Sequence, residues 1–439
     1  MLRPIRMSLA RGQAWLVPLS LLIAVAAGVW QLARIVDTYG RNVFCWDEWG
    51  ITRPLYQHAG IATIALQQDG PHREGAGILL QWAVLSLSGW SDRAEGYFLV
   101  GLLAVCALLA LLLVRRLCGR WILTDAAVPL LILTPAQSIP LITNLHFAHS
   151  FVPLLLVLLS GHAWLMAGPA RYLAILLLNL LAVFTGFGLF LGPITIALLF
   201  CTAIHARPGD RFPAWLACGM ALLTMVAFFI GWQFRPANPY FGKAQVSPGD
   251  YLVFIGRLIG HSFQAGAVIG LGVFVVLVSA ALWSGTRFAR KPDGPLAVLF
   301  LLTAFSVLYA LATTAGRASE GMATALGSQY VTLLLPGLIG LYGVVRRFRF
   351  GYPILPAGCL AIALWSFPLR SHEEAQAISW AGFNDRFAAT YLQTGSLEAA
   401  ERAAGHTVFP PDKPGRGDIA VRLEDMRRHG WSFFHSASR

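Results

Sequence analysis

Long apolar segments, separated by short polar ones, dominate the pattern of this chain. A helix that crosses a membrane needs roughly 20 mostly apolar residues. The candidate runs are residues 14–34, 96–114, 123–142, 147–167, 172–186, 188–204, 213–234, 264–285, 295–315, 329–345 and 353–369. We therefore predict an all-α polytopic membrane protein with about 11 transmembrane helices. The pair 172–186 and 188–204 is expected to form a short hairpin bent at Gly186 and Gly188.

The basic residues between these runs predict the orientation, because positively charged loops stay in the cytoplasm. With eleven crossings and a cytoplasmic N-terminus, every basic group beside the runs falls on the cytoplasmic side. These groups are Arg3, Arg6, Arg11, Arg115, Arg116, Arg120, Arg171, Arg207, Arg211, Arg287, Arg290, Lys291, Arg346, Arg347 and Arg349. A further apolar stretch, 75–90, would reverse this pattern if it crossed, so we expect it to lie in the membrane interface.

The same topology divides the chain into a transmembrane domain, 1–369, and an extracytoplasmic C-terminal helical tail, 370–439. The first outer loop, 35–95, is the largest loop outside the cytoplasm; loops 235–262 and 316–328 are the others. In the tail, Ser371 and Glu374 form a capping-box pattern, and Gly395 suits a helix end. An apolar stripe on this helix is expected to pack on the outer surface; it consists of Trp380, Phe383, Phe387 and Tyr391.

Composition agrees with a membrane protein. Only 12% of the 439 residues are charged, against about 25% in a typical soluble domain. The net charge of +12 does not indicate nucleic acid, because the basic residues lie in short blocks and not on one face. The six cysteines include no CxxC pair, so neither a disulfide framework nor a zinc site is predicted. The first apolar run is long for a signal peptide and is expected to be a retained anchor.

The stretch "NVFCWDEWG", 42–50, carries the first candidate chemistry. Asp47 and Glu48 stand between Trp46 and Trp49, and adjacent side chains on an irregular segment point in different directions. A carboxylate shielded from water has a raised pKa unless it is paired, as a general base requires. The alternatives are ordinary: acidic residues often flank a membrane anchor, and tryptophans often form an interfacial belt.

Interfacial helices are expected to follow in the first outer loop. Thr52 can cap a helix over 54–68, which "DGP" at 69–71 ends, and "HRE" at 72–74 leads into the stretch 75–90. His72 and Arg73 therefore follow an acidic platform at membrane level.

Other candidate residues lie on the same side. Arg317, in "TTAGRASEG", can hold a phosphate in a two-pronged hydrogen bond, or it can reach a lipid headgroup. Tyr330 follows in the same loop. His146 and His149 are three positions apart, which can place both on one helix face. A divalent cation bound by Asp47, Glu48 and one histidine is an alternative without supporting ligand spacing, so no cofactor is assigned.

The motifs "DEW", "HRE", "GR" and a later "SQY", together with the topology, resemble the GT-C superfamily of polytopic glycosyltransferases. This class includes protein O-mannosyltransferases and the bacterial enzymes that add aminoarabinose to lipid A. The shared features are a first span from an inside N-terminus and a large first outer loop with an early acidic motif and interfacial helices. Many bacterial relatives carry arginine before the tyrosine of the last motif, where this chain has Gln329.

The resemblance implies a sugar donor on a polyprenyl phosphate and a glycan, lipid or protein acceptor of the cell envelope. Asp47 would act as base in a single inverting displacement, and Glu48 would orient the acceptor or a cation. The implied substrate-binding residues are Arg317, His72, Arg73, Trp49, Tyr330 and His146. The implied location is the bacterial inner membrane, with the membrane lipid as a further partner and no nucleic acid.

Two other functions remain open at this point. A surface-polysaccharide polymerase or ligase also uses lipid-linked sugars, and it would depend on paired outer-loop arginines such as Arg235, Arg257 and Arg317. A transporter or flippase for lipid-linked sugars would need ionisable residues at the middle of the membrane. The predicted spans carry almost none of these.

Overall fold

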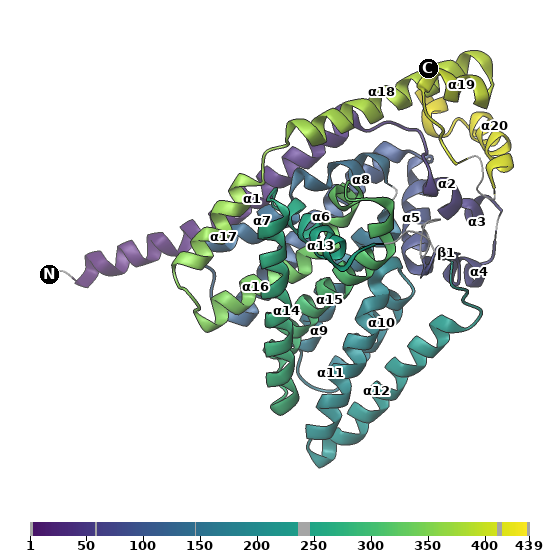
Figure 1. Ribbon diagram of the computed structural model, residues 1–439. Coiled ribbons are helices and arrows are strands. Elements are labelled where there is room, and N and C mark those ends of the chain that lie inside the picture. Colours follow the sequence, from purple (N-terminus) through teal and green to yellow (C-terminus); the bar gives the residue numbers. More distant parts are fainter. Residues whose placement is uncertain (1–2, 58, 145, 236–245, 411–414, 437–439) are drawn as a thin grey trace.

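The computed structural model describes residues 3–57, 59–144, 146–235, 246–410 and 415–436 (Figure 1). The helices are α1 (Arg3–Tyr39), α2 (Asp47–Ile51), α3 (Arg53–Tyr56), α4 (Ile61–Ala65), α5 (Gly75–Ser88), α6 (Asp92–Cys118), α7 (Ala127–Ile132), α8 (Ser138–Thr143), α9 (Val152–Trp164), α10 (Ala170–Val183), α11 (Leu191–His205), α12 (Pro208–Phe229), α13 (Pro248–His261), α14 (Ala267–Arg290), α15 (Gly294–Arg317), α16 (Leu335–Phe348), α17 (Ile354–Trp365), α18 (Ser371–Thr394), α19 (Leu397–Ala404) and α20 (Ile419–His429). The strands are β1 (Gln68–Asp69) and β2 (His72–Arg73), which pair antiparallel. Short turns of helix connect these elements: η1 (Leu123–Ala126), η2 (Pro135–Gln137), η3 (Phe147–Phe151), η4 (Gly186–Phe190), η5 (Ala318–Glu320), η6 (Thr324–Leu326), η7 (Ser328–Tyr330), η8 (Thr332–Leu334), η9 (Arg416–Asp418) and η10 (Ser432–Ser436).

Nine helical segments of the described chain are long and apolar enough to cross a membrane. They are Trp15–Tyr39, Asp92–Cys118, Leu123–Thr143, Phe147–Trp164, Gly186–His205, Pro208–Phe229, Ala267–Arg290, Gly294–Glu320 and Ser328–Phe348. The other two predicted runs form shorter apolar helices, Ala170–Val183 and Ile354–Trp365. The all-α polytopic class is therefore confirmed, while the number of eleven crossings stays a prediction.

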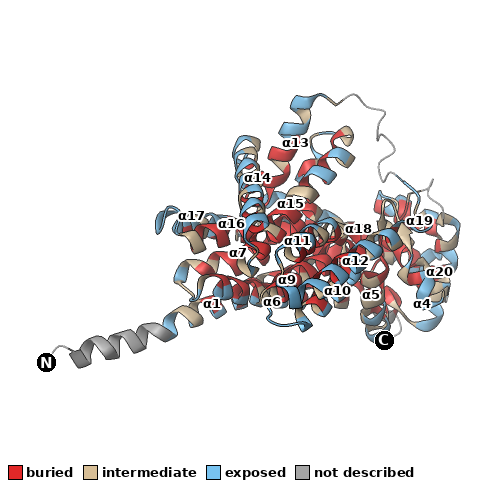
Figure 2. Ribbon diagram, turned by 90° about the horizontal axis from the view of Figure 1, so that it is seen from below, coloured by how far each residue is buried: buried red, intermediate tan, exposed pale blue. Residues whose placement is uncertain are grey.

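The spans form an inner and an outer group. The inner group is mostly buried and consists of Leu123–Thr143, Phe147–Trp164 and Ser328–Phe348. In the outer helices α1, α12 and α14, only 28% of the most apolar stretch of each helix is buried. Figure 2 shows buried residues in the middle of the molecule and exposed residues along the outer helices. Apolar side chains on such outer helices suit contact with lipid, because an apolar surface of this extent is rare in soluble monomers.

One inner span is broken. Between α7 and α8, Thr134 is extended ahead of Pro135, as the residue before a proline is expected to be. The side-chain amide of Gln137 donates to the carbonyl of Ile132 at 2.8 Å, which satisfies an oxygen that the break leaves without a helical partner. Such irregular backbone is tolerated at membrane depth where protein surrounds it. The break turns α8 toward the site described below.

Several local predictions were wrong. The helix expected over 54–68 is two short helices, α3 and α4, because the chain is extended at Gly60, and glycine is a poor helix former. The loop predicted over 235–262 contains the helix α13, whose apolar face is buried. Helix α18 begins after Arg370 without a side-chain cap, so Ser371 and Glu374 form no capping box. Its end at Gly395, in the left-handed region, is as predicted.

The first loop and the tail share one hydrophobic core, which includes the apolar stripe predicted on the tail helix α18. Side chains from residues 43–90 pack against side chains from α18, α19 and α20 and the last turn η10. Polar contacts reinforce this packing: Arg53 pairs with Asp418 at 3.0 Å, and the Ser432 hydroxyl donates to the Asn42 carbonyl at 2.7 Å. Helix α18 also runs along α1 (Figure 1). The tail thus holds the first loop in place.

Candidate functional site

A cavity of about 540 Å³ opens where the first loop, the broken span and the tail meet. Its size falls within the roughly 300–1,000 Å³ of ordinary ligand sites. Its lining residues are Trp46, Asp47, Asp69, Gly70, Pro71, His72, Ile139, Pro140, Thr143, His146, His149, Ser150, Phe187, Tyr309, Arg317, Glu320, Thr324, Gly327, Ser328, Gln329, Tyr330, Gln376, Ser379 and Trp380. Five of the eight site residues predicted from sequence are among them: Asp47, His72, His146, Arg317 and Tyr330.

Asp47 reaches the cavity because the chain turns sharply before it. Trp46 has φ 51° and ψ −126°, a conformation that is unusual for a bulky residue. The Trp46 ring packs against Trp380 of α18 and against His406, with ring centres 6.0 and 5.4 Å away. Helix α2 then begins at Asp47, whose charge acts on both His146 and Arg317. The strained turn is thus held by the tail, and it directs Asp47 and Glu48 to different places.

A cluster of histidines and acids, only partly foreseen, lines the same cavity. The β1–β2 hairpin sets Asp69 opposite His72. His149, in the π-helical turn η3, lies with its Nε2 atom 3.1 Å from Glu74 Oε1 and 3.9 Å from Asp69 Oδ2. Glu74 and Asp69 were missed as site residues. Glu74 is the third residue of "HRE", so the motif itself contained the signal.

Burial controls the charge of this cluster. The pKa of Glu74 is raised to about 7, mainly by burial and in smaller part by Asp69 and Asp47, while His149 opposes the shift. Burial, with smaller effects of His149 and Arg317, holds the pKa of His72 well below its usual range. Burial and His149 lower the pKa of His146 to about 3. At neutral pH both of these imidazoles are therefore uncharged and able to donate and accept hydrogen bonds.

Arg317 stands at the end of α15 and faces the cavity. Its Nη1 atom donates to Glu320 Oε1 at 2.6 Å, and a third of its side chain is exposed. A guanidinium has five N–H donors, so this pairing leaves others for a ligand. The loop that carries Tyr330 is anchored by Ser328, whose hydroxyl donates to the Ala136 carbonyl of the broken span at 2.6 Å.

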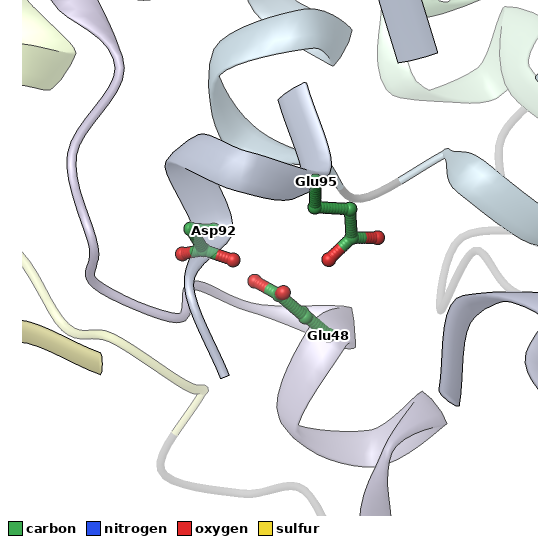
Figure 3. Close-up of side chains that lie close together, drawn as sticks. All are labelled: Glu48, Asp92 and Glu95. Carbon is green, nitrogen blue, oxygen red and sulfur yellow. The ribbon is translucent and has the colours of Figure 1, made fainter. Parts of the chain in front are cut away.

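Glu48 does not line the cavity. Its carboxylate is fully buried beside Asp92 and Glu95 of α6, and the three groups point toward one another (Figure 3). One oxygen of each lies within 4.8 Å of the others. Burial, then the neighbouring Asp92, raises the pKa of Glu48 well above its usual range. Gln81 donates to Glu95 at 2.7 Å, and the Cys45 N–H donates to Glu48 at 3.3 Å.

This acidic group differs from the cation site considered from the sequence, which combined Asp47, Glu48 and one histidine. Among the described residues, Glu48, Asp92 and Glu95 are the three potential metal ligands that lie close together. The group includes neither Asp47 nor a histidine, which the sequence had suggested as ligands. Three adjacent buried carboxylates cannot all stay ionised without a cation, so they must share protons or a metal ion. Carboxylate oxygens suit hard cations such as calcium or magnesium. Glu48 is too deeply buried to contact a ligand of the cavity.

Trp49 and Arg73 also lie away from the cavity lining. Trp49 is buried, and its indole donates to the Phe44 carbonyl at 2.8 Å, which is a core contact. Arg73 is 4% exposed and donates to the carbonyls of Phe228 and Ile230, at the end of α12. It satisfies helix-end oxygens that would otherwise be unpaired. Both residues stabilise the walls of the site.

Comparison with models of protein families finds no match to this chain, and comparison with curated proteins finds no significant sequence similarity. The chemistry of the cavity is therefore what indicates a function. The cavity combines a carboxylate, a guanidinium, a phenol and uncharged imidazoles, which can accept a proton, bind an anion and orient hydroxyl groups.

Proposed function

We propose that this chain is a membrane glycosyltransferase that moves a sugar from a polyprenyl-phosphate carrier to an acceptor of the cell envelope, which is a glycan, a lipid or a protein. The observation that supports it most is that Asp47 and Arg317, 270 positions apart in the sequence, line the same cavity. The enzyme would work in a bacterial inner membrane, with the N-terminus in the cytoplasm and the cavity on the outer side. The lipid donor would enter from the membrane.

In the proposed reaction, Asp47 takes the proton from an acceptor hydroxyl. The acceptor oxygen then forms a bond to the anomeric carbon, and the bond from that carbon to the phosphate oxygen breaks. The electron pair leaves with the prenyl phosphate, and the configuration at the carbon is inverted because the acceptor attacks from the side opposite the phosphate. Arg317 and Tyr330 hold the phosphate as its charge grows, which stabilises the transition state. His72 and His146 orient sugar hydroxyls.

The paired-arginine alternative has less support. Arg257 contacts the Met322 carbonyl at 3.4 Å, Arg235 contacts Gln233 at 3.1 Å, and neither lines the cavity. An enzyme that depends on arginines from several outer loops would gather them around the substrate. Arg317 alone occupies that position among these three.

Replacing the proposed base tests the function directly. We expect Asp47→Asn to insert and fold normally and to lose transfer by a factor of about 10²–10⁴, the usual contribution of a general base. Purified protein in liposomes would be supplied with undecaprenyl-phosphate sugars, and released undecaprenyl phosphate would be measured by mass spectrometry. Asp425→Asn, at a half-exposed position of α20 outside the cavity, is the matched control and should keep full activity. Equal activity of the two variants would contradict the proposal.

The arginine provides a second arm of the same assay. Arg317→Lys keeps the charge but not the two-pronged hydrogen bond, so we expect the KM for the lipid donor to rise about tenfold. Arg257→Lys is the control outside the cavity. If Arg257→Lys and Arg317→Lys lower transfer equally while Asp47→Asn does not, the polymerase or ligase class would replace the proposed one.

A further inference from the structure

A second cavity, of about 630 Å³, lies at the other end of the helix bundle. It is formed where α6 and α16 end. Helix α6 begins beside the acidic group at Asp92 and has 27 residues, so its two ends are roughly 40 Å apart. The lining residues are Arg116, Leu117, Cys118, Gly119, Arg120, Arg346, Arg347, Phe348, Arg349 and Tyr352. Five of these ten are arginines, and none is acidic.

Three of these arginines also bind protein groups. Arg346 pairs with the buried Asp125 at 2.9 Å. Arg347 donates to the Leu117 carbonyl at 2.7 Å, and Arg116 donates to the Leu165 carbonyl at 2.9 Å. Backbone carbonyls do not neutralise a guanidinium. Among the described residues, Asp125 is the one acidic partner of these five arginines, so the cavity keeps an excess of about four positive charges at its wall.

The other two arginines are exposed. Arg120 and Arg349 form no ion pair with any residue that the structure describes. Arg349 follows α16 with φ 55°, in the left-handed region where glycine is the usual residue. An arginine there costs about 1–2 kcal/mol of backbone strain. A positively charged side chain is therefore held at the cavity despite that cost.

An apolar groove continues from this basic cavity. A neighbouring hollow of about 390 Å³ shares Arg120 and Tyr352 with it. The remaining lining residues of this groove are Val17, Trp121, Ile122, Leu123, Thr124, Pro353 and Pro356. It runs between α1, the start of the broken span and α17, and Leu123 is half exposed on it. The groove lies among helix ends, next to surfaces that face lipid.

We propose that this pair of hollows binds an anionic phospholipid. The phosphate headgroup occupies the arginine-lined cavity, where guanidinium groups bind phosphate oxygens in pairs. One hydrocarbon chain follows the apolar groove. Arginines that only determine membrane topology need only face water. These five arginines instead surround one cavity, and that cavity continues into the apolar groove. A soluble phosphate would use the cavity but would gain nothing from the groove. The site is independent of the glycosyltransfer proposed above.

Native mass spectrometry of protein from nanodiscs tests this site, with phosphatidylcholine and phosphatidylglycerol in equal amounts. We expect phosphatidylglycerol to be retained selectively, and the double variant Arg120→Gln/Arg349→Gln to retain about tenfold less. Arg207→Gln/Arg211→Gln removes two exposed arginines at the start of α12 and outside both hollows, so it is the matched control. Thermal unfolding would show that all variants are folded.

A third variant and a competitor separate the lipid from free phosphate. Leu123→Asp places a charge in the groove, so we expect it to weaken retention of the lipid as well. Inorganic phosphate at millimolar concentration should not displace the lipid. Equal losses in the two double variants, equal retention of both lipids, or full displacement by inorganic phosphate would overturn the proposal.

Discussion

Glu74 shows how much a single buried carboxyl group depends on its surroundings. It has no exposed surface, and its nearest basic group is His149 at 3.1 Å. Asp47, by contrast, lines the open cavity. The two acids therefore differ in access: Asp47 can contact a molecule in the cavity, as the proposed reaction requires, while Glu74 lies buried beside the imidazole of His149. Histidines are commonly oriented by a carboxylate on one ring nitrogen.

The raised pKa of Glu74 predicts a pH dependence of stability. Its pKa is about 7 in the folded protein, against 4.5 in the unfolded chain. The folded state therefore holds the proton more tightly, and stability falls as pH rises from 4.5 to 7. The loss amounts to about 3 kcal/mol in total. We expect Glu74→Gln to flatten this part of the Tm-against-pH curve, while Glu424→Gln, at a half-exposed position, should leave it unchanged. A curve unaffected by Glu74→Gln would contradict the assignment.

The acidic group of Glu48, Asp92 and Glu95 predicts a stabilising substitution. Burial and Asp92 raise the pKa of Glu48, so ionisation at high pH opposes folding. Glu48→Gln keeps an acceptor for the Cys45 N–H and removes the charge. We expect it to raise the unfolding free energy by about 1–3 kcal/mol at pH 8 and to have little effect at pH 5. Thermal unfolding at both values would measure this, with exposed Glu398→Gln as control. If Glu48→Gln and chelation by EDTA both lowered the Tm, the three carboxylates would be a metal site.

At the scale of elements, short irregular segments carry the cavity. The hairpin β1–β2, the π-helical turn η3 and the turn η4 pack together around His149. Gly186, the first residue of η4, has φ 50°, and a Cβ atom there would lie 2.5 Å from His149 Cα. The chain therefore bends at this glycine, as the sequence predicted. The absence of a side chain at Gly186 also allows the backbone of His149 to approach closely. Irregular helical turns of this kind often occur at functional sites.

Gly186→Ala should therefore displace His149. We expect a loss of about 1–3 kcal/mol in unfolding free energy, from left-handed strain and from the close contact, and a loss of transfer activity. The matched control is Gly101→Ala in α6, where nothing lies within 4 Å of the added Cβ atom. That substitution should stabilise its helix by up to about 1 kcal/mol. Chemical unfolding of both variants measures the difference, and equal effects would contradict this account.

The whole molecule has two ends of different character. The candidate site, the first loop and the tail occupy one end, and the arginine-lined cavity occupies the other. The tail is joined to the first loop through a common core, and Trp380 of α18 is part of the cavity wall. The wall of this cavity therefore combines residues from the first loop and from the tail.

The proposed topology predicts which end of the molecule faces the outside of the cell and which end faces the cytoplasm. In a chain without its six native cysteines, Thr394→Cys at the end of α18 should react with a membrane-impermeant maleimide in spheroplasts. Thr286→Cys, near the end of α14, should react only after permeabilisation. Both threonines are exposed, so differences in burial do not explain such a result. The reverse pattern would place the cavity in the cytoplasm and remove the basis for an extracytoplasmic acceptor.

The sequence by itself determined the helical class and the approximate borders of the spans. This works because a backbone in lipid must satisfy its own hydrogen bonds, so long apolar runs become helices. It also singled out Asp47, His72, His146, Arg317 and Tyr330, which the cavity brings together. Their common feature is a polar side chain at the end of an apolar run on one predicted side of the membrane.

Only the tertiary structure decided which neighbour of each pair meets the cavity. Asp47 lines it and Glu48 does not, because the strained turn at Trp46 is held by Trp380 and His406, far away in sequence. The same holds for His72 and Arg73 in β2. The partnership of Glu74 with His149 and the shared core of loop and tail also depend on long-range packing. A local pattern shows which face of a segment must be buried, as on α18, but not which residues cover it, since no helical or strand period relates distant segments.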